Sequence, residues 1–359
     1  MTDEREEFKE AYRSHSLRKV SFIAVCAFLT FIVVCYASTL TVFDAGILDV
    51  MGVVWDHLTG VTYEPYTEHW YQDYEVWNLR MPNILFAVIA GMALAVGGAV
   101  MQSVMDNPLA DPYLSGVSSA ACLGVAVALI MGFSVMSGTT SQIGMMGNAF
   151  LFSLIPIAMI VVLSSYNRIS PATIVLIGVA LSSLFNALDT LLLVQANDDT
   201  LATVYDWQIG SIANLTWDSL PFALTVTVAC SVILGLLSRR LNLMSLGDRS
   251  AQSLGLNVMR LRIGSLLVIS IMTATVICYA GVIGFLGLVC PHMIRLVLGA
   301  DNRFVIPASA ALGALVLVGA YSASLSISIV GSIPVGVVMS AIGAPILLLL
   351  IVRNRKVIW

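Results

Sequence analysis

The sequence carries very little charge for its length. Only 11% of its 359 residues are Asp, Glu, Lys or Arg, whereas 58% are hydrophobic. A soluble globular protein carries about 25% charged residues, so there is too little charge here to cover a soluble surface. The composition therefore excludes an ordinary cytosolic enzyme, a disordered chain and a nucleic-acid-binding protein. It indicates a polytopic membrane protein.

Lysine is almost absent, which excludes a nucleotide-hydrolysing site of the common kind. A GxxxxGK[ST] phosphate loop needs a lysine, and the three lysines lie near the chain ends without that pattern. The patterns HExxH and GxSxG are also missing. The four histidines are scattered, so we expect no catalytic residues in this chain. These residues are Lys9, Lys19 and Lys356, and His15, His57, His69 and His292.

Cysteine is sparse and is never arranged as CxxC. All six cysteines fall inside apolar runs, so we expect neither a disulfide framework nor a metal site. The favoured interpretation is six small buried hydrophobic residues. They are Cys26, Cys35, Cys122, Cys230, Cys278 and Cys290.

The apolar runs predict an all-α protein with about ten transmembrane helices. A membrane-crossing helix needs about 20 mostly apolar residues, and nine runs meet this length. A tenth run, 284–298, is short enough to be either a span or a re-entrant segment. The nine longer runs are 20–42, 82–103, 114–135, 148–166, 172–194, 219–238, 263–282, 304–323 and 335–352.

The basic residues decide how many runs cross the membrane. If the N-terminus lies inside and all ten runs cross, every one of the 17 Lys and Arg residues except Arg80 lies on the cytoplasmic side. Cytoplasmic loops collect Lys and Arg in this way. If 284–298 did not cross, Arg353, Arg355 and Lys356 would lie outside. The sequence therefore predicts ten spans with both termini cytoplasmic.

The chain divides into a charged tail, 1–19, and a membrane domain, 20–359, with two long loops. The loop 43–81 is predicted outside the membrane and is rich in acidic and aromatic residues. An aromatic belt at the membrane interface is the favoured interpretation of most of these rings, and a surface for a soluble partner is the alternative. The loop 239–262 is predicted in the cytoplasm.

Two features inside the spans have structural and functional interpretations. In the second span, small residues recur every four positions and form a ridge that lets another helix approach closely. Asp189 is the one carboxylate well within a span, so a pathway role and a structural role, with a neighbour such as Asn186, carry equal weight. The small residues are Ala87, Gly91, Ala95, Ala99 and Ser103.

Four segments and a fifth at the last span together resemble the permease subunits of binding-protein-dependent ABC importers for iron chelates and cobalamin. Each segment is weak evidence alone, but the ordered set is specific and covers roughly residues 76–352. The segments are Arg80-Met81-Pro82, 107–112 with 116–119, 246–255, 284–295 with Pro291-His292, and 334–337 with 343–345.

The resemblance implies a homodimer in the cell membrane, with the substrate path between the two copies. It implies two separate ATPase subunits, which would bind the ATP and magnesium, and an extracytoplasmic substrate-binding protein. No cofactor is expected in this chain, and membrane lipid but no nucleic acid is expected to contact it. His292 is expected to be a packing residue rather than an iron ligand.

The resemblance also assigns roles to residues. The loop 239–262 would contact the ATPase, and a turn between spans two and three, with the turn before span five, would form the cytoplasmic gate. Arg80 would contact the binding protein. The expected ATPase contacts are Leu246, Gly247, Asp248, Ala251, Leu254 and Gly255, and the expected gate residues are Asn107, Pro108, Leu109, Pro171 and Ala172.

The chain departs from the family pattern at its outer face. Asn83, Tyr321, Leu325 and Ser332 occupy positions where the family usually has charged residues. Contact with the binding protein would then rest on Arg80, on polar groups or on the loop 43–81. We expect the cognate binding protein to rely less on acidic contact residues, or to present basic residues to the loop 43–81.

The leading hypothesis is an importer of an iron chelate of the ferric siderophore kind. A cobalamin or corrinoid importer is the alternative, and the choice rests on how common each substrate is in the family. An ion-coupled secondary transporter is less favoured, because it would need paired charges within the spans.

Overall fold

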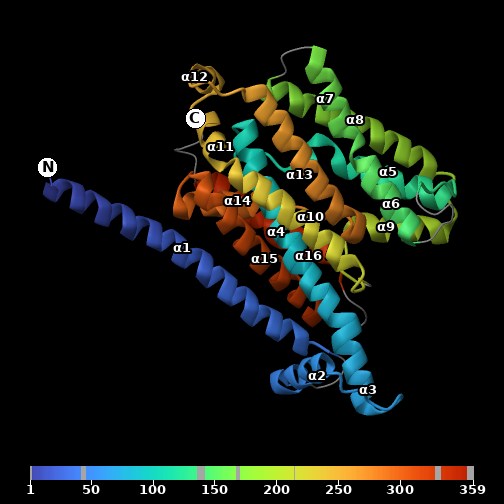
Figure 1. Ribbon diagram of the computed structural model, residues 1–359. Coiled ribbons are helices and arrows are strands. Elements are labelled where there is room, and N and C mark those ends of the chain that lie inside the picture. Colours follow the sequence, from blue (N-terminus) through green and yellow to red (C-terminus); the bar gives the residue numbers. More distant parts are fainter. Residues whose placement is uncertain are drawn as a thin grey trace.

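The computed structural model describes residues 2–41, 46–135, 142–166, 170–213, 215–327 and 333–353. Helices make up almost all of these ranges, and no strand occurs within them, which confirms the all-α prediction (Figure 1). Ser332, one of the four positions that depart from the family pattern, lies outside the described residues.

Eighteen helical elements follow one another along the described chain. They are α1 (Thr2–Thr39), α2 (Ile47–Thr59), α3 (Glu68–Asp73), the π-helix η1 (Tyr74–Arg80), α4 (Met81–Met105), the 3-10 helix η2 (Pro112–Ser115), α5 (Val117–Ile130), α6 (Gln142–Ser153), α7 (Ile155–Tyr166), α8 (Pro171–Leu193), α9 (Asp198–Ile209), α10 (Ser219–Leu236), α11 (Ser238–Met244), α12 (Asp248–Ser253), α13 (Val258–Ala280), α14 (Leu286–Leu298), α15 (Asn302–Ile327) and α16 (Val335–Arg353).

All ten predicted apolar segments are helical. Within the described ranges, seven helical stretches are long and apolar enough to cross a membrane, and three shorter apolar helices complete the set. The short ones are Val117–Ile130, Leu286–Leu298 and Val335–Leu350. The segments occur in the predicted order, while the side of the membrane on which the termini lie stays a prediction.

Two predicted spans have different boundaries in the structure. The run 114–135 forms only the short helix α5, because Pro112 starts the separate helix η2 and Gly116, with a φ of +86°, turns the chain between them. The run 148–166 begins earlier, at Gln142, and is interrupted at Leu154. Pro156 follows the interruption, and proline cannot donate the backbone hydrogen bond that a continuous helix needs.

Helix α4 is the centre of the molecule. Most of its residues are buried, and it packs against α15, α14, α13 and α10. The predicted ridge of small residues faces α15: a Cβ on Gly91 would overlap the backbone of Gly313, and one on Gly313 would overlap Gly91 and Ala95. Small side chains therefore let the two helix backbones touch, as the sequence predicted.

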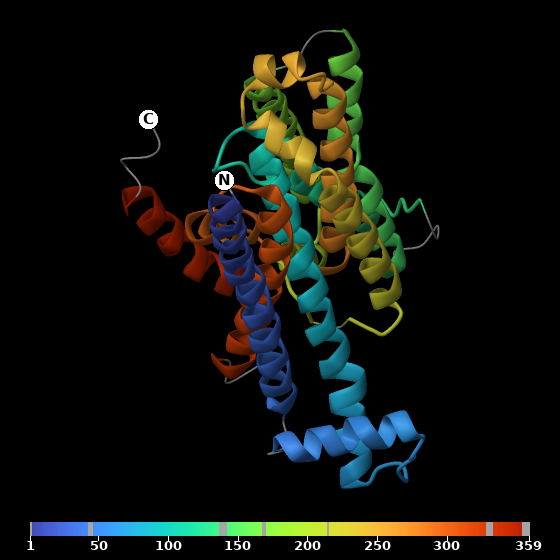
Figure 2. The same cartoon turned by 60° about the vertical axis from the view of Figure 1, so that its left-hand side comes forward.

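The predicted loop 43–81 is mostly helical. Helices α2 and α3 and the π-helix η1 occupy it, and η1 continues directly into α4. In Figure 2, α2 lies crosswise at the ends of α1 and of the η1 extension of α4. Helix α1 itself runs unbroken from the charged tail into the first span and packs along α15.

Candidate functional site

The predicted ATPase-contacting loop forms a short helix between two exposed leucines. Gly247 and Gly255 flank α12 with φ angles of +89° and +83°, a region that other residues rarely adopt. Ala251 is fully buried, whereas Leu246 and Leu254 are exposed. Helix α12 spans only Asp248–Ser253, so both leucines lie beyond its ends.

A buried arginine connects this loop to the end of α4. Arg262, in the first turns of α13, donates from Nη2 to both carboxylate oxygens of Asp248, at 2.8 and 3.1 Å. Its Nε donates to the carbonyl oxygen of Val104 at 3.2 Å. One guanidinium therefore joins α12, α13 and the last turn of α4. Such planar, two-point contacts fix the relative position of the groups they join.

A second arginine binds the same end of α4. Arg295 of α14 donates from Nη2 to the carbonyl oxygen of Ala99 at 2.9 Å and to Oγ of Ser103 at 2.8 Å. Ser103 Oγ in turn donates to Oδ1 of Asn302 at 2.9 Å. Carbonyl groups at a helix C-terminus carry a partial negative charge, so both arginines stabilise this end of α4.

Sequence reasoning missed Arg262 and Arg295 as site residues. It counted both only as cytoplasmic positive charges. Their positions offered one usable signal, since each lies within or beside an apolar run where an unpaired charge is costly. The partners, Val104 and Ala99, are backbone carbonyl groups far away in sequence.

The predicted gate turn follows directly after this anchored end of α4. Asp106 adopts a left-handed conformation, and Asn107 Oδ1 accepts a hydrogen bond from the N–H of Leu109 at 2.9 Å. Asn107, Pro108 and Leu109 are exposed. The turn is therefore held by its own local hydrogen bonds and by α4, while its tip is free to meet another surface.

Asp111 ends this turn and is buried. Its Oδ1 accepts from the N–H of Tyr113 at 2.8 Å and so caps η2. Burial raises the pKa of the Asp111 carboxyl to about 6. Tyr113 donates its hydroxyl to the carbonyl oxygen of Ile283 at 3.0 Å, which joins η2 to the segment before α14.

The second predicted gate element, Pro171 with Ala172, starts α8. Ser170 caps this helix, and its Oγ accepts from the N–H of Thr173 at 3.2 Å. Helix α8 packs against η2 through Gly178, on which a Cβ would overlap the carbonyl oxygen of Leu114. The two gate elements are thus linked through η2.

Arg80 lies at the end of η1. Its Nη2 donates to Glu75 Oε1 at 3.1 Å, and its side chain is partly buried. Of the positions that depart from the family pattern, Asn83 is buried and accepts from the N–H of Leu215 at 3.1 Å, and Tyr321 is buried beside Arg80 and Asn83. These two residues fill the interior beside the N-terminal end of α4, opposite to the end that Arg262 and Arg295 bind.

Asp189 joins α8 to α9. Its Oδ2 accepts from Nε2 of Gln208 at 2.9 Å, so its partner is Gln208 rather than the suggested Asn186. Its Oδ1 is buried and has no hydrogen-bond partner among the described residues.

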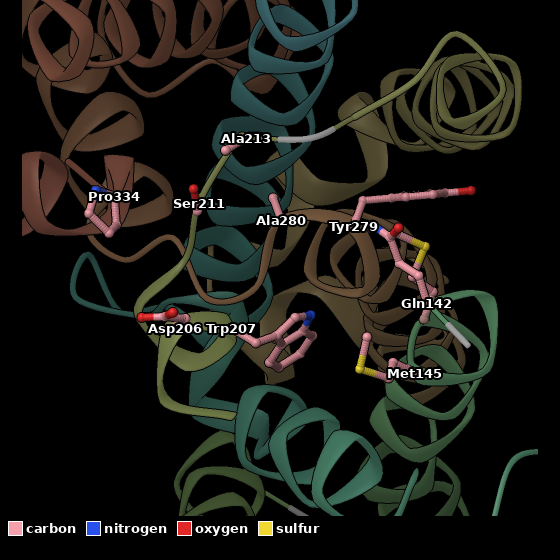
Figure 3. Close-up of a pocket in the computed structure, with 10 residues that line it drawn as sticks. Gln142, Met145, Asp206, Trp207, Ser211, Ala213, Tyr279, Ala280 and Pro334 are labelled. Atoms are coloured by element: carbon pink, nitrogen blue, oxygen red, sulfur yellow. The ribbon is translucent and has the colours of Figure 1, made fainter. Parts of the chain in front are cut away.

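A cavity of about 410 Å³ lies beside Gln208, between α6, α9 and the end of α13. In Figure 3, Trp207 of α9 and Met145 of α6 lie on facing sides of it, with Tyr279 and Gln142 nearby. Its lining mixes apolar and polar groups with one carboxylate, Asp206. Among the described residues, no group of three or more His, Cys, Asp or Glu side chains is placed to hold a metal ion.

The apolar helices define a class, the multi-pass membrane proteins. The sequence pattern of the FecCD transport family matches residues 25–353, and the chain belongs to this family. It is thus an ABC importer permease of the cell membrane.

Relatives of the chain act on different substrates. It is 38% identical to the hemin transport system permease protein HmuU of Yersinia pestis, over 79% of this chain and 85% of that protein. It is 36% identical to the vitamin B12 import system permease protein BtuC of Vibrio cholerae, over 78% and 83% of the two chains. It is 32% identical to the molybdate import system permease protein MolB of Haemophilus influenzae, over 85% and 87%.

A solved structure shares the fold. It is described as an inward-facing conformation of a metal-chelate type ABC transporter, with a TM-score of 0.79 and 28% identity. The match covers 93% of this chain and 99% of that chain.

Proposed function

We propose that the protein is the permease subunit of an importer for an iron chelate of the ferric siderophore kind, with a corrinoid as the alternative substrate. It works as a homodimer with both termini in the cytoplasm. Two separate ATPase subunits bind ATP and magnesium and hydrolyse the nucleotide, and an extracytoplasmic binding protein delivers the chelate. The permease itself carries no cofactor and catalyses no reaction.

The contacts of Arg262 with its two neighbouring elements, α12 and α4, are the observation that carries this proposal. Leu246 and Leu254 are exposed on the loop that would meet the ATPase, while Asp248 beside them is ion-paired to Arg262. Arg262 also holds Val104, three residues before the gate turn at Asn107. A displacement of α12 by the ATPase would therefore reach the turn through direct contacts.

A polar stripe on α8 supports a path between two copies. Ser183, Asn186 and Thr190 are exposed on this span, and their spacing of three and four residues places them on one helix face. An amide exposed to lipid within a span is costly, so this face fits a water-filled path better than a lipid contact. Asp189 lies at the outer part of the same helix, and the hydrogen bond that it accepts from Gln208 ties α8 to α9.

The support for a metal chelate comes from the relatives. A hemin permease, a vitamin B12 permease and a structure of metal-chelate type are among the similar proteins. A molybdate permease is also among them, so the residues shared with the family leave the substrate open. Arg80 remains the proposed contact with the binding protein. Because its guanidinium is paired with Glu75, the binding protein would meet the two side chains together.

The test is ligand-stimulated ATP hydrolysis by the reconstituted complex of permease, ATPase and binding protein. Substitution of Gly247 or Gly255 by leucine should abolish the stimulation, because a side chain at a positive φ would distort the loop. Gly264→Ala in α13 is the matched control, since a Cβ there meets no atom within 4 Å. Full stimulation in both loop variants would contradict the ATPase contact.

A further inference from the structure

Helix α2 lies at the level where the outer ends of two spans emerge. Seven residues separate its start from the end of α1 at Thr39, a length of chain that reaches at most about 25 Å. On its other side α2 packs against η1, which continues into α4. Figure 2 shows α2 lying crosswise at the ends of both spans. Helix α2 therefore runs along the membrane surface rather than through it.

One face of α2 is fixed to the protein. Val50 is buried, and the ring of His57 stacks on Trp77 of η1 with 4.1 Å between ring centroids. His57 Nδ1 also lies 3.2 Å from Asp73 Oδ1. Trp77 in turn packs against Trp217, whose Nε1 donates to the Trp77 carbonyl oxygen at 2.9 Å. This face holds α2 against the outer extension of α4.

A second face of α2 is apolar and uncovered. Leu48, Met51, Trp55 and Leu58 are 83%, 55%, 68% and 68% exposed. Their spacing of three, four and three residues places them in one stripe along the helix. The carboxylates Asp49 and Asp56 lie about a quarter of a turn away from Leu48, outside the stripe, so the exposed surface is divided into an apolar side and an acidic side.

Helix α1, which packs against α2, also exposes an apolar surface. Only 17% of the apolar window of α1 is buried, and Phe28 and Phe31 are exposed on it. A helix that lies in the membrane plane, with one apolar and one charged side, buries the apolar side among the lipid headgroups and upper acyl chains. Tryptophan favours that depth. We infer that α2 is an interfacial helix whose Leu48, Met51, Trp55 and Leu58 stripe inserts into the outer leaflet.

The inserted helix would hold the outer end of α4 at a fixed depth. It reaches α4 through His57, Trp77 and Trp217, at the end opposite to Arg262 and the gate turn. Motion of α4 during transport would then be confined to its cytoplasmic end. The insertion itself depends on the membrane location of the chain and not on the proposed substrate.

Site-directed spin labelling of the full chain in phosphatidylcholine nanodiscs tests the insertion. Labels would be placed singly at Leu48→Cys, Met51→Cys and Leu58→Cys, with Asp49→Cys as the water-facing control and Phe28→Cys as the lipid-facing control. Serine would replace Cys35 and Cys122, because the other four cysteines are buried. Relaxation by oxygen, which concentrates in lipid, is compared with relaxation by a water-soluble nickel chelate.

If the stripe is inserted, oxygen should relax the three stripe labels more strongly than the nickel chelate does, and the label at Phe28 should behave in the same way. At Asp49 the nickel chelate should relax the label more strongly than oxygen does. Stripe labels that the nickel chelate reaches as readily as Asp49 would overturn the inference in favour of a water-exposed stripe. Labels shielded from both reagents would overturn it in favour of a contact with a second copy. Nickel access that is lost only when the binding protein is added would identify a docking surface for that protein instead.

Discussion

Arg262 is the residue on which the proposed path from the predicted ATPase-contacting loop to the predicted gate turn depends. Its side chain is buried, whereas its partner Asp248 is 43% exposed. Without the guanidinium, the Asp248 carboxylate would still be partly hydrated, but the carbonyl oxygen of Val104 would lose its hydrogen-bond donor. The loss is therefore closer to that of a charge-assisted hydrogen bond than to that of a fully buried ion pair.

We expect Arg262→Gln to lower the free energy of unfolding by about 1–3 kcal/mol and to lower the amount of substrate transported per ATP hydrolysed. Arg260→Gln, two residues earlier on the exposed side of α13, is the control and should change neither quantity. Thermal unfolding and paired transport and hydrolysis assays measure both. Asp248→Asn should add little to Arg262→Gln, because the two side chains share one interaction.

Equal transport per ATP in the two arginine variants would contradict the proposed path. A loss of stability in Arg262→Gln without a loss of coupling would leave Arg262 a purely structural residue.

Through the Asp111 carboxyl, the free energy of unfolding should depend on pH, and the raised pKa determines the sign of this dependence. Burial raises its pKa from 3.8 to about 6, so the folded protein binds this proton more tightly than the unfolded chain does. The stabilising contribution is complete below pH 3.8 and is lost as the pH rises through about 6. Asp111→Asn has no titrating group and should remove this dependence.

The unfolding free energies of the wild type and Asp111→Asn should therefore diverge by on the order of 2 kcal/mol between pH 4 and pH 7. Tryptophan fluorescence during thermal unfolding in detergent micelles reports the difference. Asp106→Asn at the neighbouring exposed, left-handed position is the control, and its curve should follow the wild type. Parallel curves for Asp111→Asn would show that the carboxyl is hydrated.

At the scale of elements, long apolar runs were predictable and interruptions were not. About 20 apolar residues in a row have one stable arrangement in a bilayer, so the long spans could be located from the sequence. The separate helix η2 depends on the capping carboxylate of Asp111 and on contacts with α8 and Ile283. The contacts with α8 and Ile283 join residues far apart in sequence and cannot be predicted from a local pattern, whereas the Asp111 cap is local, two residues from Tyr113.

The site residues also divide into those that the sequence could indicate and those that it could not. Gly247 and Gly255 were assigned through the family resemblance, and their positive φ angles fit a tight loop, while the ATPase contact itself stays a prediction. The role of Arg262 could not be assigned from the sequence, since it is defined by Val104, which is 158 residues away in sequence. The ridge on α4 was visible, but its partner Gly313 on α15 was not.

The contact of α4 with α15 predicts different outcomes for two glycines on one helix. Gly313→Ala places a Cβ into the backbone of Gly91 and should destabilise the protein by about 1–3 kcal/mol. Gly319→Ala on the same helix meets no atom within 4 Å and should be neutral or slightly stabilising. Thermal unfolding of the purified variants measures the difference. Equal melting temperatures of the two variants would mean that the backbones of α4 and α15 do not touch at Gly91 and Gly313.

At the scale of the whole molecule, the exposed apolar surface does not by itself separate lipid contacts from contacts between copies. Helix α8 offers a distinction because its exposed surface has two kinds of side chain. Ser183, Asn186 and Thr190 occupy one face, and Leu184 and Leu188 lie on another. In a homodimer with the path between the copies, the polar face meets water and the leucine face meets lipid or protein.

We therefore expect Asn186→Cys to react with a charged, membrane-impermeant thiosulfonate in the assembled complex, and Leu188→Cys to stay unreacted. Water must reach the sulfur to ionise the thiol and admit the reagent, so reactivity reports hydration rather than mere exposure. Bound chelate in the path should slow the reaction at Asn186→Cys. If Asn186→Cys were as unreactive as Leu188→Cys in every state of the complex, the polar face would be a dry helix contact, and the path would have to run elsewhere.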